Sequence, residues 1–449
     1  MRARRVSIAV ILVLFLGVYL YMNPLLPIIT GYASKNLASG VFVAGRSQQS
    51  LENNDLNFSF IKFVKNKVNY ETGEVKSSFL WYTSRSVFIE NFGCTLVNDA
   101  TTDEIRSRPY SAVAIVPENP DTINWPMGDL LADTIPHEIN PQKLEEALHL
   151  AFVDTIPYKG TFAVNVVYKG QLIAEKYRDD FKSNTKFLSW SMAKSFTNAL
   201  TGILVKTGQL TIDQPVAINE WLGDERKNIN LNSLMHMNSG LEWNEDYGNN
   251  SDVNIMLHKI GDMGQYTLEK SFQDPMDTKW VYSSGSTNIV SKIIRQTINN
   301  DQAYYELPRK ELFNKIGMRS AVWEVDASGT FVGSSYIYAT MRDYARFGLL
   351  YLNNGNWLGE QILPENWVEW SRSEAVGSDG QYGAFFWLNL EGTDYPDVPL
   401  DMFCCRGHDG QYIYIIPSKD LVVVRTGFSK KGEFDYNEFL AGIVNSIEE

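Results

Sequence analysis

The 449-residue sequence predicts an α+β enzyme body of about 300 residues behind an apolar N-terminus and a small β-rich stretch. Three observations favour this fold class. Residues 141–153 carry apolar side chains at helical spacing, residues 162–177 and 412–427 read as hairpins, and the chain begins with arginines followed by an apolar run. The composition, 44% hydrophobic and 21% charged, is that of an ordinary globular protein.

Charge and motif content exclude several function classes. The chain has 40 basic and 53 acidic residues, so we expect no nucleic-acid partner. It lacks Gly-x-Gly-x-x-Gly, Walker and Gly-x-Ser-x-Gly motifs, and its five histidines never pair at metal-ligand spacing, so we expect no metal and no cofactor. Three cysteines, Cys94, Cys404 and Cys405, are too few for a disulfide framework, and the vicinal pair receives no role.

The N-terminal segment is typical of a signal anchor. Arginines at positions 2, 4 and 5 precede 17 apolar residues, Val6 to Met22, the lower limit for a spanning helix, and residues 25–29 could extend the span. We expect residues 1–32 to form an uncleaved, single-pass membrane anchor that holds the body outside the cytoplasm. The alternative is cleavage at Gly31-Tyr32-Ala33 followed by secretion. It is the second choice, because that site lies about ten residues beyond Met22, rather far from the apolar run.

Two further regions follow the anchor. Residues 33–140 are expected to hold a small, polar linker (33–55), strands from 58 to about 116 with a turn at Glu71 to Gly73, and a Pro-rich connection with a turn at Trp125 to Asp129. Residues 141–449 are expected to form the enzyme body. It should include a hairpin turning at Lys169-Gly170, a helix from Ser191 to Lys206, and a final hairpin turning at 417–420.

The candidate chemistry starts from Ser-x-x-Lys, which occurs at Ser59/Lys62, Ser183/Lys186 and Ser191/Lys194. On the strand expected at 58–64, positions i and i+3 point to opposite faces, and residues 177–186 read as a solvated loop. In the helix that Ser191 opens, positions i and i+3 share a face. Apolar neighbours would lower the pKa of Lys194, so that it could act as a base, and the helix start offers a free N–H to an oxyanion. The alternative is an N-capping serine with an exposed lysine.

Two downstream features strengthen the case. Tyr282 stands on a turn before a helix-like segment, where its phenol could reach the serine, and residues 407–411 (Gly-His-Asp-Gly-Gln) precede a strand. Each feature alone is also compatible with ordinary packing or a bulge.

Together these motifs resemble the serine hydrolases of the β-lactamase and penicillin-binding-protein superfamily. The order Ser-x-x-Lys, Tyr-x-Ser, His-x-Gly is similar to the branch of class C β-lactamases, related esterases, D-aminopeptidases and 6-aminohexanoate-oligomer hydrolases. Segments 234–241 and 333–357 also match, and the resemblance spans roughly residues 143–447. It implies an antiparallel β-sheet flanked by helices, with a mostly helical subdomain.

The resemblance also implies roles for individual residues. Ser191 would form the acyl-enzyme, Lys194 would deprotonate it, and Tyr282 would relay the proton to the leaving group. The backbone N–H groups of Ser191 and Gln411 would form the oxyanion hole. Five further residues complete the expected site: Ser284, where many relatives have asparagine; His408, where β-lactamases have lysine, with Gly410 beside it; and Trp243 and Tyr247 as candidate cleft-lining residues, for which ordinary packing is the alternative.

Departures from the β-lactamase pattern bear on the substrate. The chain has Tyr-x-Ser and His-Asp-Gly where class C β-lactamases have Tyr-x-Asn and Lys-Thr-Gly. Histidine is mostly neutral at pH 7 and Asp409 adds negative charge, so an anionic substrate is disfavoured. We therefore expect a serine hydrolase of small or peptide-like, neutral or amine-bearing amides or esters. The alternatives are a β-lactamase or D-Ala-D-Ala carboxypeptidase, and a non-catalytic surface binding protein; the oligomeric state stays open.

Overall fold

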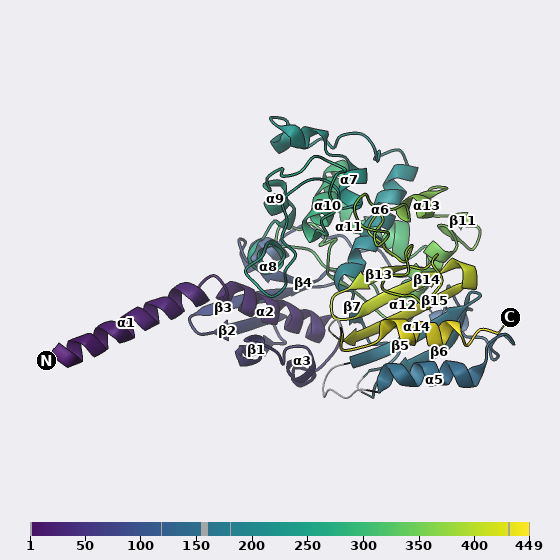
Figure 1. Ribbon diagram of the computed structural model, residues 1–449, viewed down its shortest axis with the longest axis horizontal. Coiled ribbons are helices and arrows are strands. Elements are labelled where there is room, and N and C mark those ends of the chain that lie inside the picture. Colours follow the sequence, from purple (N-terminus) through teal and green to yellow (C-terminus); the bar gives the residue numbers. More distant parts are fainter. Residues whose placement is uncertain (1, 118, 154–159, 180, 430–431, 449) are drawn as a thin grey trace.

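The computed structural model describes residues 2–117, 119–153, 160–179, 181–429 and 432–448, and its centre is a six-stranded antiparallel sheet (Figure 1). The strand order is β12-β13-β14-β15-β5-β6. Helices α5 (Pro141–Phe152) and α14 (Tyr436–Val444) cover one face, and α12 (Met341–Leu352) packs on the other. The strands are β5 (Gly160–Tyr168), β6 (Gln171–Tyr177), β12 (Trp387–Leu388), β13 (Phe403–Gly407), β14 (Gln411–Ile416) and β15 (Leu421–Phe428).

The local sequence explains this sheet and confirms both predicted hairpins. Strands β5, β14 and β15 are buried along their whole length, as expected for apolar strands covered on both faces. The β5–β6 turn uses Lys169 and Gly170, both at positive φ. Helix α5 begins where the Asn140 side chain accepts a hydrogen bond from the Lys143 N–H at 3.1 Å.

A mostly helical subdomain lies beside the sheet, in teal and green in Figure 1, as the sequence predicts. The predicted helix 191–206 begins as a 3₁₀ turn, Trp190–Met192, and continues as the buried helix α6 (Ala193–Lys206). The other helices are α7 (Leu231–Met235), α8 (Asp252–Lys259), α9 (Met263–Leu268), α10 (Ser284–Ile298), α11 (Asp301–Leu307) and α13 (Trp367–Ser371). Five short strands lie outside the central sheet: β7 (Phe187–Leu188), β8 (Val322–Trp323), β9 (Ile337–Ala339), β10 (Asn356–Trp357) and β11 (Glu360–Gln361).

The N-terminal extension contains the predicted β-rich region as a four-stranded antiparallel sheet in chain order. The first expected strand is wrong: residues 58–64 form a turn and a 3₁₀ segment, Ile61–Phe63, and Ser59 has φ 43°. Strands β3 and β4 contribute to the same hydrophobic cluster as α6, so the extension packs into the core of the body. The strands are β1 (Lys65–Asn69), β2 (Glu74–Phe79), β3 (Tyr82–Ile89) and β4 (Gly93–Val97), and the short helix α4 (Thr102–Arg106) follows.

The predicted linker at 33–55 is also wrong, because most of it is helical. Helix α2 (Leu26–Phe42) is largely buried and packs across β2, β3, β4 and α8, and α3 (Gln48–Asn54) follows it. The small residues that suggested a linker permit this close packing. A Cβ at Gly31 would lie 2.6 Å from the His258 carbonyl oxygen, and one at Gly40 would overlap Leu51.

Helix α2 is fixed to the body by a buried ion pair. The Lys35 ammonium contacts the Glu324 carboxylate, and both side chains are at most 3% exposed. Ser39 donates to the same carboxylate at 2.8 Å, and the Cys94 backbone N–H donates at 2.6 Å. Every oxygen of this buried carboxylate therefore has a partner, which is the condition under which a charge is tolerated in a core.

Helix α1 (Arg2–Met22) projects away from the body, and the apolar side chains between Val6 and Tyr21 are exposed (Figure 1). Among the described residues, no single helix has both the length and the apolar character needed to cross a membrane. Val6–Met22 and Leu26–Phe42 meet that test only as a pair, bent by 47°, on length and composition alone. Residues 26–29, which could extend the span, belong to α2, most of which is packed inside the protein.

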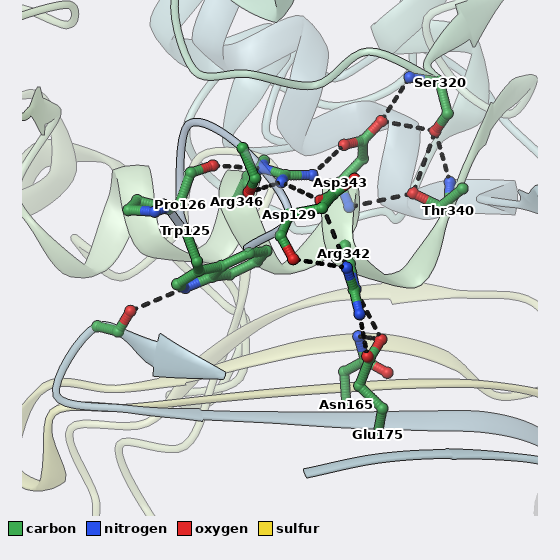
Figure 2. A network of polar contacts seen from close by, with 12 residues as sticks. Trp125, Pro126, Asp129, Asn165, Glu175, Ser320, Thr340, Arg342, Asp343 and Arg346 are labelled. Atoms are coloured by element: carbon green, nitrogen blue, oxygen red, sulfur yellow. Dashed lines mark hydrogen bonds and ion pairs between the residues drawn. The ribbon is translucent and has the colours of Figure 1, made fainter. Parts of the chain in front are cut away.

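The Pro-rich connection is clamped onto helix α12 by arginines (Figure 2). Arg346 donates to the Asp129 carboxylate at 2.6 Å and to Asp343 at 2.7 Å. Arg342 joins the same helix to the sheet through the Glu175 carboxylate of β6, at 2.5 Å and 3.0 Å. The turn predicted at 125–129 is thus part of the packed body rather than a free connection.

Candidate active site

The structure brings Ser191 and Lys194 together at the start of α6. Ser191 is 8% exposed and Lys194 is 1% exposed. The Lys194 Nζ lies 2.9 Å from the Ser191 Oγ, which confirms that the two side chains share a face. The N-capping alternative is wrong on both counts, since the lysine is buried and the serine makes no capping hydrogen bond.

The other contacts of Lys194 define how its nitrogen is oriented. Its Nζ lies 3.0 Å from the Ser284 Oγ and 3.3 Å from the Ser334 carbonyl oxygen. The Ser284 hydroxyl donates its own proton to Glu245 at 2.6 Å, so its oxygen must accept from the lysine. A neutral Lys194 would thus donate its two N–H groups to the Ser284 hydroxyl oxygen and the Ser334 carbonyl oxygen. Its lone pair would then face the Ser191 hydroxyl.

Burial adjusts the acidity of both predicted proton-transfer groups. Desolvation lowers the pKa of Lys194 to about 8, and the Glu245 charge opposes part of this shift. Desolvation raises the pKa of the Tyr282 phenol, and Glu245 raises it further, so this phenol is neutral at pH 7. The Lys194 Nζ lies 4.9 Å from the centre of the Tyr282 ring. Lysine is therefore the group that can act as a base, and tyrosine can only donate or relay a proton.

Glu245 is the residue of this site that the sequence analysis missed. Its carboxylate accepts from the Ser284 backbone N–H at 2.9 Å and from the Ser284 hydroxyl, and the Trp243 indole also donates to it. A signal was present, because Glu245 stands between the two candidate cleft aromatics, Trp243 and Tyr247. It fixes the start of α10 against Lys194 and places a negative charge near the lysine.

Replacing Glu245 separates these two effects. Glu245→Gln keeps an acceptor for Ser284 but removes the charge, so the pKa of Lys194 should fall and the acid limb of the pH–rate profile should move to lower pH. Glu245→Leu leaves the Ser284 donors unpaired and should lower kcat about tenfold or more. Steady-state kinetics from pH 5 to 10 measure both. An unchanged profile in Glu245→Gln would contradict the electrostatic role.

A cavity of about 640 Å³ opens onto Ser191 and contains several predicted residues. Tyr282, His408, Gly410 and Tyr247 line it. The Tyr247 ring stacks on the His408 imidazole, with centroids 4.5 Å apart and planes inclined by 20°. Five more aromatic side chains line it together with polar and charged residues: Trp387, Tyr395, Tyr412, Phe434 and Tyr436.

Besides the buried Lys194, three predicted residues lie outside this cavity lining. Ser284 is fully buried behind Lys194, and the Trp243 indole supports Glu245. Gln411 also lies outside it: its side chain donates to the Gly427 carbonyl at 2.6 Å, and the residue lines a different pocket. Gly407 and Gln411 pair across the β13–β14 turn, and His408, which follows β13, lines the same cavity as Ser191.

Gly407 shows how closely β13 approaches the nucleophile turn. A Cβ at this position would lie 2.2 Å from the Ser189 carbonyl oxygen, so only glycine allows the strand to pack there. The neighbouring Trp190 has φ 44° and is held by its packing: its indole stacks on Tyr32 of α2, with centroids 6.0 Å apart, and meets the edge of His408 at 5.7 Å. Helix α2 therefore supports Trp190, the residue next to Ser191.

An arginine side chain that the sequence did not point to also lines the cavity. Arg406 lines it beside Asp394, with which it forms an ion pair at 3.2 Å, and its guanidinium lies over the Trp387 ring at 4.9 Å. Asp409 and Asp435 line the same cavity. Carboxylates therefore outnumber fixed cations there, even though a cation is present.

The cysteines offer no competing nucleophile in this region. Cys94, Cys404 and Cys405 are free and buried. Burial raises the pKa of Cys404 to about 12 and that of Cys405 above its ordinary range, so both are protonated thiols at neutral pH. Among the described parts of the chain, no group of three histidine, cysteine or acidic side chains is placed to hold a metal ion.

Comparison with known proteins agrees with this geometry. Residues 159–438 match the β-lactamase family. The chain is 24% identical over 328 residues to the 6-aminohexanoate-dimer hydrolase of Paenarthrobacter ureafaciens, covering 66% of this chain and 76% of that one. It is similar in structure to a Bacillus anthracis protein provisionally named a 6-aminohexanoate-dimer hydrolase (24% identity, TM-score 0.56, 75% and 89% coverage). It also resembles a penicillin-binding-protein homologue from Caulobacter crescentus (14% identity, TM-score 0.54, 70% and 97% coverage).

The family match covers well over half of the chain, and it includes the turn that carries Ser191, the helix that carries Lys194 and the β13–β14 hairpin beside them. The protein belongs to the β-lactamase family and is a serine hydrolase that cleaves amide or ester bonds.

Proposed function

We propose that Ser191 forms an acyl-enzyme with an amide or ester substrate and that Lys194 is its base. One observation carries this proposal. The Lys194 nitrogen lies 2.9 Å from the Ser191 oxygen, while Ser284 and Ser334 occupy its other hydrogen-bonding positions. A neutral lysine held in this way accepts the serine proton as the Ser191 oxygen attacks the carbonyl carbon.

Collapse of the tetrahedral intermediate needs a proton on the leaving group. In the proposal the proton taken by Lys194 passes through the Tyr282 hydroxyl to the departing amine or alcohol. The raised pKa of Tyr282 supports this role, because a neutral phenol can accept one proton while it donates another. Water then attacks the acyl-enzyme with the same groups acting in reverse, and the Ser191 hydroxyl is restored.

We assign the oxyanion hole to the backbone N–H groups of Ser191 and His408. This replaces Gln411, because His408 follows the strand that packs against the nucleophile turn and lines the same cavity as Ser191. Two such donors stabilise the developing negative charge, each by about 3 kcal/mol.

The charges of the cavity favour a neutral or ammonium-bearing substrate. Arg406 is paired with Asp394 and Asp409 lies 3.3 Å from the His408 imidazole, while Asp435 adds a further carboxylate to the lining. The aromatic walls suit an extended aliphatic or peptide-like chain. The name of the Paenarthrobacter ureafaciens relative, 6-aminohexanoate-dimer hydrolase, indicates an aliphatic amide substrate for that relative.

Covalent labelling tests the nucleophile. A fluorophosphonate probe should label the wild-type protein and fail to label Ser191→Ala. Ser183→Ala, which alters another Ser-x-x-Lys serine in an exposed loop, is the matched control and should be labelled normally. Equal labelling of Ser191→Ala would refute the assignment, and absence of all labelling and hydrolysis would favour the non-catalytic binding protein.

A substrate panel tests the charge preference. We expect kcat/KM for p-nitroanilides and p-nitrophenyl esters with an ammonium or methyl terminus to exceed that of carboxylate-terminated analogues about tenfold, equal to about 1.4 kcal/mol. Preference for the carboxylate would contradict the proposal. Appreciable hydrolysis of a chromogenic cephalosporin, lost in Ser191→Ala, would favour the β-lactamase or carboxypeptidase alternative.

We further propose that α1 attaches the protein to the cell membrane, with the body outside the cytoplasm. Its exposed apolar side chains and the arginines in the sequence before them support this. The full chain should stay in the membrane pellet after a carbonate wash, and a chain starting at Asn23 should not. An intact full chain in the soluble fraction would refute attachment, and removal of residues 1–33 would favour secretion.

A further inference from the structure

A second pocket of about 260 Å³ lies between the N-terminal extension and the enzyme body, and we call it the seam pocket. The extension contributes the end of α2 and the β3–β4 turn, and the body contributes Lys186, the helical turn Pro308–Phe313 and the segment from Arg319 to Trp323. Its lining combines three cations, Lys186, Arg309 and Arg319, with aromatic side chains: Phe42, Phe88, Phe92, Phe313, Trp323 and Phe331.

The charge of Lys186 and Arg309 is poorly compensated. Lys186 is half-buried rather than solvated as its sequence context suggests, and it has no hydrogen bond or ion pair among the described residues. Burial and the neighbouring Arg309 lower its pKa. Arg309 is anchored to the carbonyl oxygens of Met318 and Ala321, and burial, with repulsion from Arg319, lowers its pKa to about 10.

The nearest described carboxylates do not neutralise these two groups. Asp343 attracts Lys186 and Arg309, but it is 1% exposed and already bonded to Arg346 at 2.7 Å and to the Ser320 N–H at 2.7 Å (Figure 2). Glu90 also lines the pocket, yet it is exposed and forms no ion pair with either of them. The pocket therefore holds positive charge that an anion would stabilise.

We propose that the seam pocket binds a small amphiphile with one anionic head, held by Lys186, Arg309 and Arg319, and an apolar tail among the aromatic side chains. Guanidinium groups pair with carboxylate or phosphate oxygens in charge-assisted hydrogen bonds, and the ammonium of Lys186 supplies further donors. The volume of about 260 Å³ corresponds to about nine water-sized groups, so a head with a chain of about eight carbons fits. The site is separate from the Ser191 cavity and does not depend on the proposed reaction.

Octanoate is the probe, and neutral octanamide is its isosteric control. Octanoate should bind the full-length protein saturably in calorimetry and raise its Tm by about 2–4 °C at 100 times its Kd, whereas octanamide should bind at least about tenfold more weakly. Inorganic phosphate tests the head group alone and should also bind more weakly. Octanamide or phosphate binding as tightly as octanoate would overturn the amphiphile proposal.

Lys186→Met locates the binding. This variant should bind octanoate about tenfold or more weakly, and without ligand it should be at least as stable as wild type, because it removes a half-buried, unpaired charge. Lys67→Met, on the exposed strand β1, should change neither quantity. Lys186→Arg keeps the charge and should still bind octanoate. If Lys186→Met does not fold, the octanoate affinity of Lys186→Arg is measured instead. Unchanged octanoate affinity in Lys186→Met would overturn the proposal.

Discussion

Lys194→Met is expected to lower kcat/KM about 10³-fold at pH 8, with a much smaller change in KM. The methionine fills most of the lysine's volume but cannot accept the Ser191 proton, and a positioned base contributes about 10²- to 10⁴-fold to such reactions. Lys206→Met, at the other end of α6, is the matched control and should retain activity. Steady-state kinetics on the best substrate of the panel measure the effect. Activity within about threefold of wild type would show that Lys194 is not the base.

The same lysine predicts how rate and stability depend on pH. Only the neutral amine accepts a proton, so kcat should rise as the pH increases through about 8 and then level off. The folded pKa of about 8 lies below the ordinary value of 10.5, so the unfolded chain binds more protons between these two pH values. The free energy of unfolding should therefore gain about 3 kcal/mol from this group as pH rises from 8 to 10.5. Below pH 8 that penalty is fully present.

Denaturation of Lys194→Met checks this linkage. At pH 7 the variant lacks the buried charge, so urea unfolding should show it to be more stable than wild type, and the difference should shrink toward pH 10. A variant that is less stable at pH 7 would mean that the lysine's hydrogen bonds outweigh its desolvation.

The parts of the site that could be predicted from the sequence are those fixed by local geometry. Ser191 and Lys194 share one helical turn, so their spacing alone brings them together. Tyr282 was recognised from its motif, just before the N-terminus of α10. Ser334 meets Lys194 from a loop, and Glu245 is joined to it through Ser284. The place of Glu245 between two candidate cleft aromatics marked it as a site residue, but no local spacing indicates which partners such loop residues will meet.

Gln411 shows a second reason why part of the site could not be predicted from the sequence. Which of two paired strands borders a nucleophile depends on the hairpin register and on the approach of Gly407 to Ser189. One strand ends at Gly407 and the next begins at Gln411, and the sequence pattern alone does not tell which backbone N–H between them faces Ser191.

The fold divides in the same way. The two hairpins and α5 were predicted because turn residues and the helical spacing of apolar side chains are local signals. Helix α2 was mistaken for a linker because its glycines, alanines and serines resemble a flexible segment in composition. Their value lies in tertiary packing, where small side chains let α2 approach β3 and α8.

Glu324→Gln is expected to be the most destabilising single change, by about 3–5 kcal/mol in urea unfolding. It leaves the buried Lys35 ammonium without a counter-charge, although the substituted amide could still accept from Ser39 and the Cys94 N–H. The double variant Lys35→Met/Glu324→Gln removes the stranded charge and should recover most of the loss. A double variant as unstable as Glu324→Gln would mean that the loss comes from packing rather than from charge.

The matched control is an exposed pair with the same chemistry. Lys169 and Glu138 form an ion pair at 2.5 Å, but the lysine is 49% exposed and the pair is screened by water, so Glu138→Gln should change the urea midpoint far less than Glu324→Gln. Activity gives a second readout. Helix α2 carries both Lys35 and Tyr32, and Tyr32 stacks on Trp190 next to Ser191, so loosening α2 should lower kcat as well. Recovery of kcat together with stability in the double variant would show that the buried pair acts on catalysis by holding α2 against the nucleophile turn.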